Sequence, residues 1–196
     1  RSKDGTFYAQ DKYSIFYNDV EFEGPEYILF TDSLKYNSRN EVIETYGPTK
    51  IVTQDSIYVN SLGGNFQTKK KSSLLKMSTI ETSNYTLEAN EINLDNNTQF
   101  YVANENVKLK VKESDYIITG NKGYYDKKNN ITKIYDKALL KKVFSNDTFY
   151  LSSDTIIAYD DSTNLDMIIA YNNVKFYKEN FTGKTDSIIF LIKDSI

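Results

Sequence analysis

The sequence predicts an all-β protein, a solenoid-like open β-jelly roll in which antiparallel strands stack into a bent, V-shaped sheet. Three observations point to this fold. Apolar and polar residues alternate with period two, a polar pair recurs about every 32 residues, and residues 18–34 (NDVEFEGPEYILFTDSL) align without a gap with residues 172–188 (NNVKFYKENFTGKTDSI). A β chain with a repeat of this length favours a stack in which each unit pairs with its neighbours and buries a continuous interior.

The period-two alternation predicts strands with one buried face. Residues 108–112 read Lys-Leu-Lys-Val-Lys, so the lysines lie on one face and the apolar residues on the other. Shorter lines with apolar first and third residues begin at Val20, Val107, Ala138 and Val174, and a related line begins at Thr49.

The recurring polar pair predicts a corner in the sheet. Leu87 and Ala89 share one alternation phase, whereas Ile92 and Leu94, beyond the pair at Asn90, share the other. A one-residue slip turns every side chain to the opposite face, so both runs point inward only if the strand bends or bulges at the pair. The pairs begin at Asp32, Asp55, Asn90, Asn121, Asp154 and Asp186, in steps of 23, 35, 31, 33 and 32 residues. The short step to Asp55 suggests a shortened hairpin.

Clusters of Asn, Asp and Ser predict the tight turns between strands, because their side chains bond the local backbone and tolerate the left-handed conformation. These clusters are 37–40, 95–97, 126–130 and 160–164. Gly63-Gly64 is expected to be an isolated turn, Lys69–Lys71 a solvated turn, and Lys70–Met77 a loop or a single helical turn. No amphipathic helix of three turns is expected. We therefore predict a single domain over residues 1–196, with repeats over about 18–192.

Composition excludes several classes of function. The 196 residues contain no Cys and no His, which excludes disulfides and Cys- or His-ligated metals, and the net charge of −3 gives no overall attraction for nucleic acid. No apolar stretch reaches the roughly 18 residues of a membrane helix. The chain opens on Arg1 rather than Met, which fits the removal of a signal peptide.

The carboxylates do not form a recognisable catalytic or metal-binding motif. Asp154, Asp160, Asp161 and Asp166 lie at or near predicted turns and corners, where Asp is favoured by the backbone. A glycosidase-type acid and base pair would need distinct environments, and an oxygen-ligand calcium loop would need an Asp-x-Asp-x-Asp-Gly pattern that the chain lacks. We expect no enzyme activity, no cofactor and no metal.

One set of lines resembles a known family. Residues 123–140 (GYYDKKNNITKIYDKALL), 104–109 (NENVKL) and 171–176 (YNNVKF) are similar to the repeats of the OstA/LptA-like family, including its OstA-like N-terminal domain, and the resemblance spans about 18–192. The glycine usual before the Asn-Val pair is missing. The resemblance implies a periplasmic protein, free or associated with the outer membrane, that carries the acyl chains of lipopolysaccharide in a hydrophobic groove. It also implies edge-strand pairing with other jelly-roll components of the transport bridge, or a head-to-tail homo-oligomer, and no nucleic acid.

The predicted inward columns are the candidate lipid groove. They comprise Leu34, Tyr36, Leu87, Ile92, Leu94, Val107, Leu109, Ile118, Leu140, Ile156, Val174, Phe176, Ile188 and Phe190. The same columns would serve equally as the closed core of a non-catalytic β-solenoid scaffold or surface interaction domain, and no sequence pattern separates these alternatives. A carbohydrate-active β-helix is a third, more distant alternative.

Overall fold

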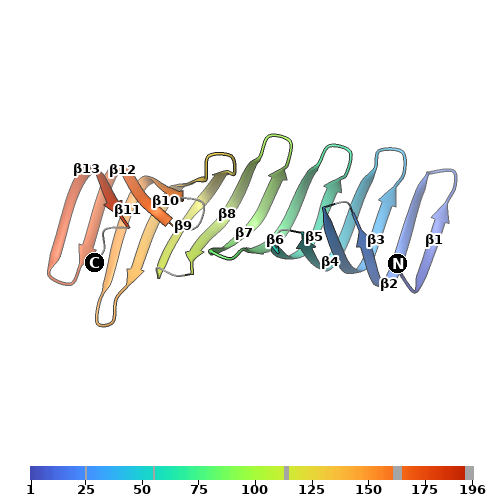
Figure 1. The fold of residues 1–196 in the computed structure, drawn as a ribbon, viewed down its shortest axis with the longest axis horizontal. Coiled ribbons are helices and arrows are strands. Elements are labelled where there is room, and N and C mark those ends of the chain that lie inside the picture. Colours follow the sequence, from blue (N-terminus) through green and yellow to red (C-terminus); the bar gives the residue numbers. More distant parts are fainter. Residues whose placement is uncertain (25, 55, 113–114, 161–164, 193–196) are drawn as a thin grey trace. The chain divides into compact units, whose positions relative to one another are not determined.

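The computed structural model describes residues 1–24, 26–54, 56–112, 115–160 and 165–192. These residues form thirteen strands in one sheet whose strand order is the chain order, so each strand pairs with the next one along the chain (Figure 1). The prediction of an all-β antiparallel fold is confirmed. The strands are β1 (Asp4–Tyr8), β2 (Tyr13–Glu23), β3 (Tyr27–Asn37), β4 (Val42–Thr53), β5 (Tyr58–Gln67), β6 (Ser72–Glu81), β7 (Tyr85–Asp95), β8 (Phe100–Val111), β9 (Tyr116–Asp126), β10 (Ile131–Val143), β11 (Thr148–Asp160), β12 (Leu165–Lys178) and β13 (Phe181–Leu191).

The chain divides into two compact units. Unit 1 comprises residues 1–82 and 90–99, and unit 2 comprises residues 83–89 and 100–196. Strand β7 contributes its first half to unit 2 and its second half to unit 1. The single domain expected over residues 1–196 stays a prediction. In the part of the chain that the structure describes, no helix is long and apolar enough to span a membrane.

Most strands bend near their middle, as the phase slips predicted. Pairing registers shift between Thr31 and Leu34 in β3, between Asn104 and Val107 in β8, and between Tyr135 and Ala138 in β10. The predicted polar pair at Asp32 lies within the β3 shift, and the pairs at Asn121 and Asp154 lie opposite the β8 and β10 shifts. The backbone feature that makes the bend lies on the alternate strands, where two consecutive residues adopt left-handed φ values, as at Asp136 (60°) and Lys137 (63°). Such a bulge inserts unpaired residues and kinks the strand.

The same bulge recurs along the sheet. It falls at Asn18-Asp19 in β2, Glu105-Asn106 in β8, Asp136-Lys137 in β10 and Asn172-Asn173 in β12, while Gly47 supplies the positive φ in β4 and Met77 in β6. The first residues of these sites are 29, 30, 28, 31 and 36 positions apart. One bent hairpin therefore occupies about 30 residues.

Each bend divides a strand into two halves, which we call limb A and limb B. In unit 1, limb A comprises residues 20–23, 27–31, 49–53, 58–61 and 78–81, and limb B comprises 13–17, 34–37, 42–45, 63–67, 72–75 and 92–95. In unit 2, limb A comprises 85–89, 107–111, 116–120, 138–143, 148–153, 174–178 and 181–185, and limb B comprises 100–104, 122–126, 131–135, 155–160, 165–171 and 187–191.

Both limbs contribute to the core of each unit. In unit 1, buried side chains come from limb A (Val20, Leu29, Ile51, Val59) and from limb B (Leu34, Ile43, Phe66, Leu75, Ile92). In unit 2, the largest come from limb A (Val107, Ile118, Leu140, Leu151) and from limb B (Ile134, Ile156, Ile168). Buried hydroxyls bond the backbone near the bends, for example Thr31 to the carbonyl oxygen of Pro48 at 3.1 Å. Because the core of each unit consists only of the inward side chains of the two limbs, a chain with 39% hydrophobic residues is sufficient to fill it.

The structure corrects the predicted position of the corner near β5. Asp55 lies outside the described residues, and Ser56 belongs to the connection between β4 and β5 rather than to a corner. The register of β4 against β5 shifts around Leu62, which stands where the other odd-numbered strands carry a polar pair. The corner positions Asp32, Leu62 and Asn90 are thus 30 and 28 residues apart, and no hairpin is shortened.

Two further expectations in this region were wrong. Gly63-Gly64 lies inside β5, not in a turn: Gly63 has φ +118°, and a Cβ there would lie 2.8 Å from the carbonyl oxygen of Thr45. Ser72–Met77 belongs to β6, and only the residues before it form a turn. Leu74 and Leu75 belong to this strand. The polar run of three lysines and two serines before them makes the segment look like a loop in the sequence. The solvated turn at Lys69–Lys71 is confirmed.

The predicted Asn- and Asp-rich turns are confirmed where the structure describes them. Residues 38–41, 96–99 and 127–130 form turns, and Asp126 accepts backbone hydrogen bonds from Lys128 and Asn129 at 3.1 and 3.2 Å. Of the fourth cluster, Asp161, Ser162, Thr163 and Asn164 lie outside the described residues.

Candidate functional site

The fourteen predicted groove residues fall into two groups by exposure. Eight are buried, at most 5% exposed, and six are half-buried. The buried ones are Leu34, Ile92, Val107, Leu109, Ile118, Leu140, Ile156 and Val174, and the half-buried ones are Tyr36, Leu87, Leu94, Phe176, Ile188 and Phe190. Within each unit the interior is therefore filled by the protein's own side chains. The role of these residues in binding stays a prediction.

Aromatic pairs connect limb A to limb B within each unit. Tyr27 of β3 contacts Phe66 of β5, with ring centroids 6.3 Å apart. The same relation, from limb A of one strand to limb B of the next odd-numbered strand, holds for Tyr85 with Tyr125 (6.3 Å) and for Phe149 with Phe190 (5.5 Å). Sequence reasoning identified only Phe190. The available signal was an aromatic residue within the first two positions of β3, β7 and β11.

The tyrosine pair of unit 2 is held neutral by its surroundings. Burial raises the pKa of Tyr85 far above its usual value, and the neighbouring Tyr125, which is hydrogen-bonded to it, adds to this rise. Burial also raises the pKa of Tyr125. In unit 1, burial and then the charge of Glu26 raise the pKa of Tyr27. Neutral rings at these positions suit an apolar interior rather than proton transfer near neutral pH.

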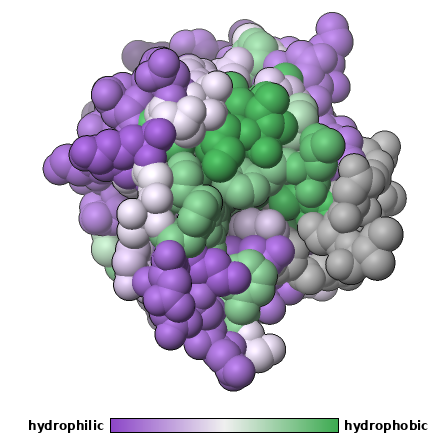
Figure 2. Space-filling view, turned by 90° about the vertical axis from the view of Figure 1, so that its left-hand side faces the viewer, coloured by the Kyte–Doolittle hydropathy of each residue, from purple (hydrophilic) through white to green (hydrophobic). Residues whose placement is uncertain are grey.

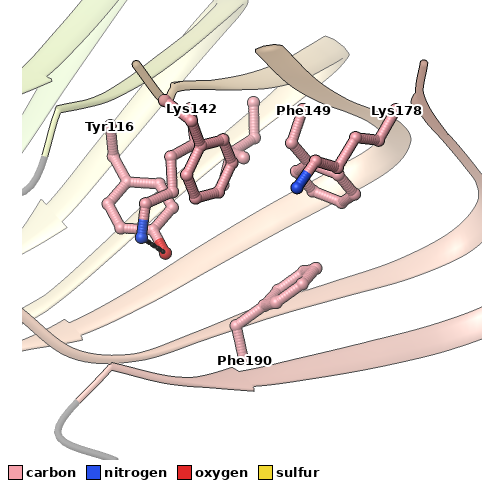
Figure 3. A pocket seen from close by; sticks show the side chains of 7 residues that line it. Tyr116, Lys142, Phe149, Lys178 and Phe190 are labelled. Atoms are coloured by element: carbon pink, nitrogen blue, oxygen red, sulfur yellow. Dashed lines mark hydrogen bonds between the residues drawn. The ribbon is translucent and has the colours of Figure 1, made fainter. Parts of the chain in front are cut away.

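Unit 2 contains a cavity of about 150 Å³ between its limbs. Limb A and its loop supply Tyr116, Leu140, Lys142, Phe144, Phe149 and Lys178, whereas limb B supplies Phe190. Figure 3 shows Phe190 on the opposite side of the cavity from Tyr116, Lys142, Phe149 and Lys178. The Phe149 and Phe190 rings meet edge to face, at an interplanar angle of 73°. Leu140 and Phe190 are thus the two predicted groove residues that the structure brings to this cavity.

Among the described residues that line the cavity, two lysines carry the only charges. Lys142 Nζ donates a hydrogen bond to the Tyr116 hydroxyl at 3.0 Å and lies 4.4 Å from the centroid of that ring. Both ammonium groups also face Phe144, at 5.2 Å for Lys142 and 4.4 Å for Lys178. Among the described residues, neither lysine forms an ion pair with a carboxylate. Aromatic faces stabilise a cation without neutralising it, so both charges remain able to attract an anion.

The predicted turn carboxylates that the structure describes lie in the neighbouring strands β11 and β12. Asp154 lies opposite the β12 bulge and accepts a hydrogen bond from the Asn173 side chain at 2.8 Å. Asp160 ends β11, Asp166 lies in β12, and Asp161 falls outside the described residues. The described ranges hold no group of three or more acidic residues placed to bind a metal.

The edge of unit 2 at β13 carries apolar side chains. Phe181, Ile189 and Leu191 are 61%, 59% and 57% exposed. Seen from the β13 side, Figure 2 shows hydrophobic residues gathered in the middle of the face, with hydrophilic residues to their left and below them. No strand of the described residues pairs with the outer edge of β13. An unpaired edge with exposed apolar groups is suited to strand pairing with another chain.

Together, the fold and the site define an all-β protein of consecutive bent hairpins with a lysine-rimmed apolar cavity between the limbs of unit 2. No protein-family model and no curated protein sequence matches the chain. Among solved structures, the chain is similar to the crystal structure of LptH, the LptA homologous periplasmic component of the conserved lipopolysaccharide transport device from Pseudomonas aeruginosa. The match has 11% sequence identity and a TM-score of 0.30, and it covers 69% of this chain and 80% of that one.

Proposed function

We propose that this chain is a non-catalytic periplasmic carrier that holds acyl chains of lipopolysaccharide between its limbs, as part of a bridge to the outer membrane. The observation that carries the proposal is that both limbs of each unit present apolar side chains to each other, with aromatic side-chain contacts between them. The family resemblance of residues 104–109, 123–140 and 171–176 supports the periplasmic location and the lipid.

Acyl-chain binding requires the limbs to separate locally, because their inner columns are now in mutual contact. Each CH₂ group that leaves water contributes about 0.8 kcal/mol, so roughly ten buried CH₂ groups contribute about 8 kcal/mol. Replacing one apolar contact by another leaves the protein side chains buried, and an aromatic pair such as Tyr85 and Tyr125 contributes only about 0.5–1.5 kcal/mol beyond its buried area. The free energy gained by burying the acyl chain can therefore offset the cost of separating the two limbs locally.

The bridge would form by strand pairing at the sheet edges. In the described residues, β1 and β13 each pair on one side only. Main-chain hydrogen bonds from a further strand would satisfy the free edge of β13 and cover its apolar side chains. The partners proposed are other jelly-roll components of the transport bridge or a second copy in head-to-tail order.

Photo-crosslinking tests the carrier function. A photoreactive amino acid placed at Leu94 or at Ile156 faces the interior, whereas one at Lys110 lies on the exposed outer face of β8. We expect lipopolysaccharide adducts at the first two positions and none at Lys110, with circular dichroism confirming that each variant is folded. Folded variants that give no interior adduct would refute lipid carriage.

A second candidate is a non-catalytic β-solenoid scaffold or surface interaction domain with a permanently closed core. The complete burial of Leu140, Leu151 and Ile168, each 0% exposed, favours it. A scaffold predicts that the interior probes stay unmodified while the edge of β13 still binds a protein partner. The same crosslinking experiment therefore separates the two functions.

A further inference from the structure

We propose that the cavity between Lys142, Lys178 and Phe190 is a binding site for the phosphate-bearing end of a lipid. The first few carbons of its alkyl chain would fill the cavity, and the phosphate would lie against the two ammonium groups. This site gives the carrier a head-group preference, and to that extent the inference rests on the proposed function.

The size and lining of the cavity set the apolar part of the ligand. A cavity of about 150 Å³ holds roughly one benzene ring, or about six carbon atoms. Its walls are aromatic and aliphatic, from Tyr116, Leu140, Phe149 and Phe190, so water inside finds few polar partners. An alkyl segment is therefore a better occupant than water or a sugar.

The charges set the polar part of the ligand. Both lysines are half-buried, line the same cavity and lie within 5.2 Å of the centre of the same Phe144 ring. Binding of one head group at that cavity requires both flexible side chains to reach it. Lys142 keeps its position through the Tyr116 hydroxyl, which uses one of its three ammonium hydrogens. A phosphate monoester presents two negative charges and three acceptor oxygens, which matches two partly desolvated ammonium groups better than a neutral or cationic head group does.

The position of Phe144 adds to this arrangement. Its backbone N–H donates to the carbonyl oxygen of Asp147 at 2.8 Å, which closes the short loop between β10 and β11. The Phe144 ring is 42% exposed and lies beside the cavity. It contacts the ammonium groups of both Lys142 and Lys178. An exposed Phe in a polar loop is explained if it keeps the two cations at the cavity mouth.

The test is a ligand series measured by NMR amide shifts on the full chain. The probes are hexyl phosphate, 1-hexanol, hexyltrimethylammonium and inorganic phosphate. We expect hexyl phosphate to bind most tightly, with shifts confined to residues around the cavity. Each CH₂ added from butyl to hexyl phosphate should raise the affinity about fourfold, and the gain should stop near six carbons because the cavity is full. Inorganic phosphate alone should bind far more weakly, which separates a lipid head group from a free anion.

The lysine variants test the charges. K142Q and K178Q should each weaken hexyl phosphate binding about two- to fivefold, and the double variant about tenfold, in each case by more than they weaken 1-hexanol binding. K175Q is the matched control, since Lys175 lies exposed in β12 and does not line the cavity. Equal affinities for the phosphate, alcohol and ammonium probes, or an undiminished affinity in the double variant, would overturn the proposal.

The two hypotheses fail separately. Hexyl phosphate binding at the cavity, without lipopolysaccharide adducts at Leu94 or Ile156, would retain this site and reject lipopolysaccharide carriage. Interior adducts without any preference for the phosphate probe would retain carriage and reject the head-group site.

Discussion

The bulge at Asp136 and Lys137 makes a quantitative prediction about what bends the sheet. Lys137 has φ 63° and an exposed side chain. A left-handed backbone costs a non-glycine residue about 1–2 kcal/mol, and glycine in a strand costs about 0.5–1 kcal/mol in entropy. We therefore expect K137G to raise the free energy of unfolding by about 0.5–1 kcal/mol. K137V should lower it by about 1–2 kcal/mol, because a β-branched side chain fits this region worst.

Urea unfolding followed by circular dichroism measures both changes. For a slope of about 2 kcal/mol per M, the midpoint should rise by about 0.3–0.5 M in K137G and fall by about 0.5–1 M in K137V. K110V is the matched control, because Lys110 is exposed in β8 with an ordinary φ, and its effect should stay within about 0.5 kcal/mol. If K137V and K110V had equal midpoints, and K137G gained nothing, the bulge conformation would not be what bends β10.

Three further outcomes test local chemistry. The Tyr46 hydroxyl donates to Glu44 at 2.6 Å, and this bond raises the pKa of Tyr46 to about 12; E44Q should move that pKa toward 10, measured by ¹³C NMR of labelled tyrosine with Y46F for assignment. Burial raises the pKa of Tyr85, so its stabilising contribution is complete below pH 10, the unfolded value, and is lost as the pH rises above it. Y85F should therefore lose less stability than wild type between pH 9 and pH 11, and equal losses in urea midpoint would contradict this. A Cβ at Gly183 would overlap the ring of Phe176, so G183A should displace that ring and lower the free energy of unfolding by about 1–3 kcal/mol. The displacement should change the aromatic ring-current shifts in NMR spectra. Unchanged shifts would show that the ring does not pack there.

The sequence predicted the bend better than its mechanism. The phase slip from Ala89 to Ile92 required a corner, and the burial of both residues, at 6% and 0%, follows from it. The slip was visible because it moves apolar residues, which composition reveals directly. The left-handed residues that produce the bend, such as Glu105 and Asn106, were not identified. A charged residue in a strand looks the same in sequence whether its φ is negative or positive.

The register error at β5 has a comparable cause. The polar-pair pattern predicts the corner at Asp55, whereas the corner lies at Leu62, where no polar pair exists. Two glycines take part in the bend there: Gly47 of β4 supplies the positive φ of the bulge, and Gly63 of β5 has a φ of +118° that favours glycine. A glycine within an otherwise alternating strand is the signal for this bend, whereas the Gly63-Gly64 pair considered alone predicts a turn.

The cavity was beyond what the alternation pattern can show. Its walls join Tyr116, Leu140 and Phe149 from one limb with Phe190 from the other, and they meet only once the bend has formed. Lys142 and Lys178 looked like ordinary charged residues near strand ends. Their proximity to one Phe144 ring depends on a loop between two strands, which sequence spacing alone does not define.

The similarity between residues 18–34 and 172–188 reflects a shared backbone bend more than a shared packing of the core. Both stretches place two left-handed residues, Asn18-Asp19 and Asn172-Asn173, directly before a buried valine. The residues facing each other across the hairpin differ in a compensating way. In the first stretch Phe22 pairs with the fully buried Leu29, and in the second Phe176 pairs with Gly183. The missing side chain at Gly183 leaves space that the Phe176 ring occupies. The same backbone arrangement therefore supports a different side-chain packing in each of the two stretches. The backbone device that bends the hairpin is therefore the repeated element, and the side chains between the limbs are free to vary with what each unit encloses.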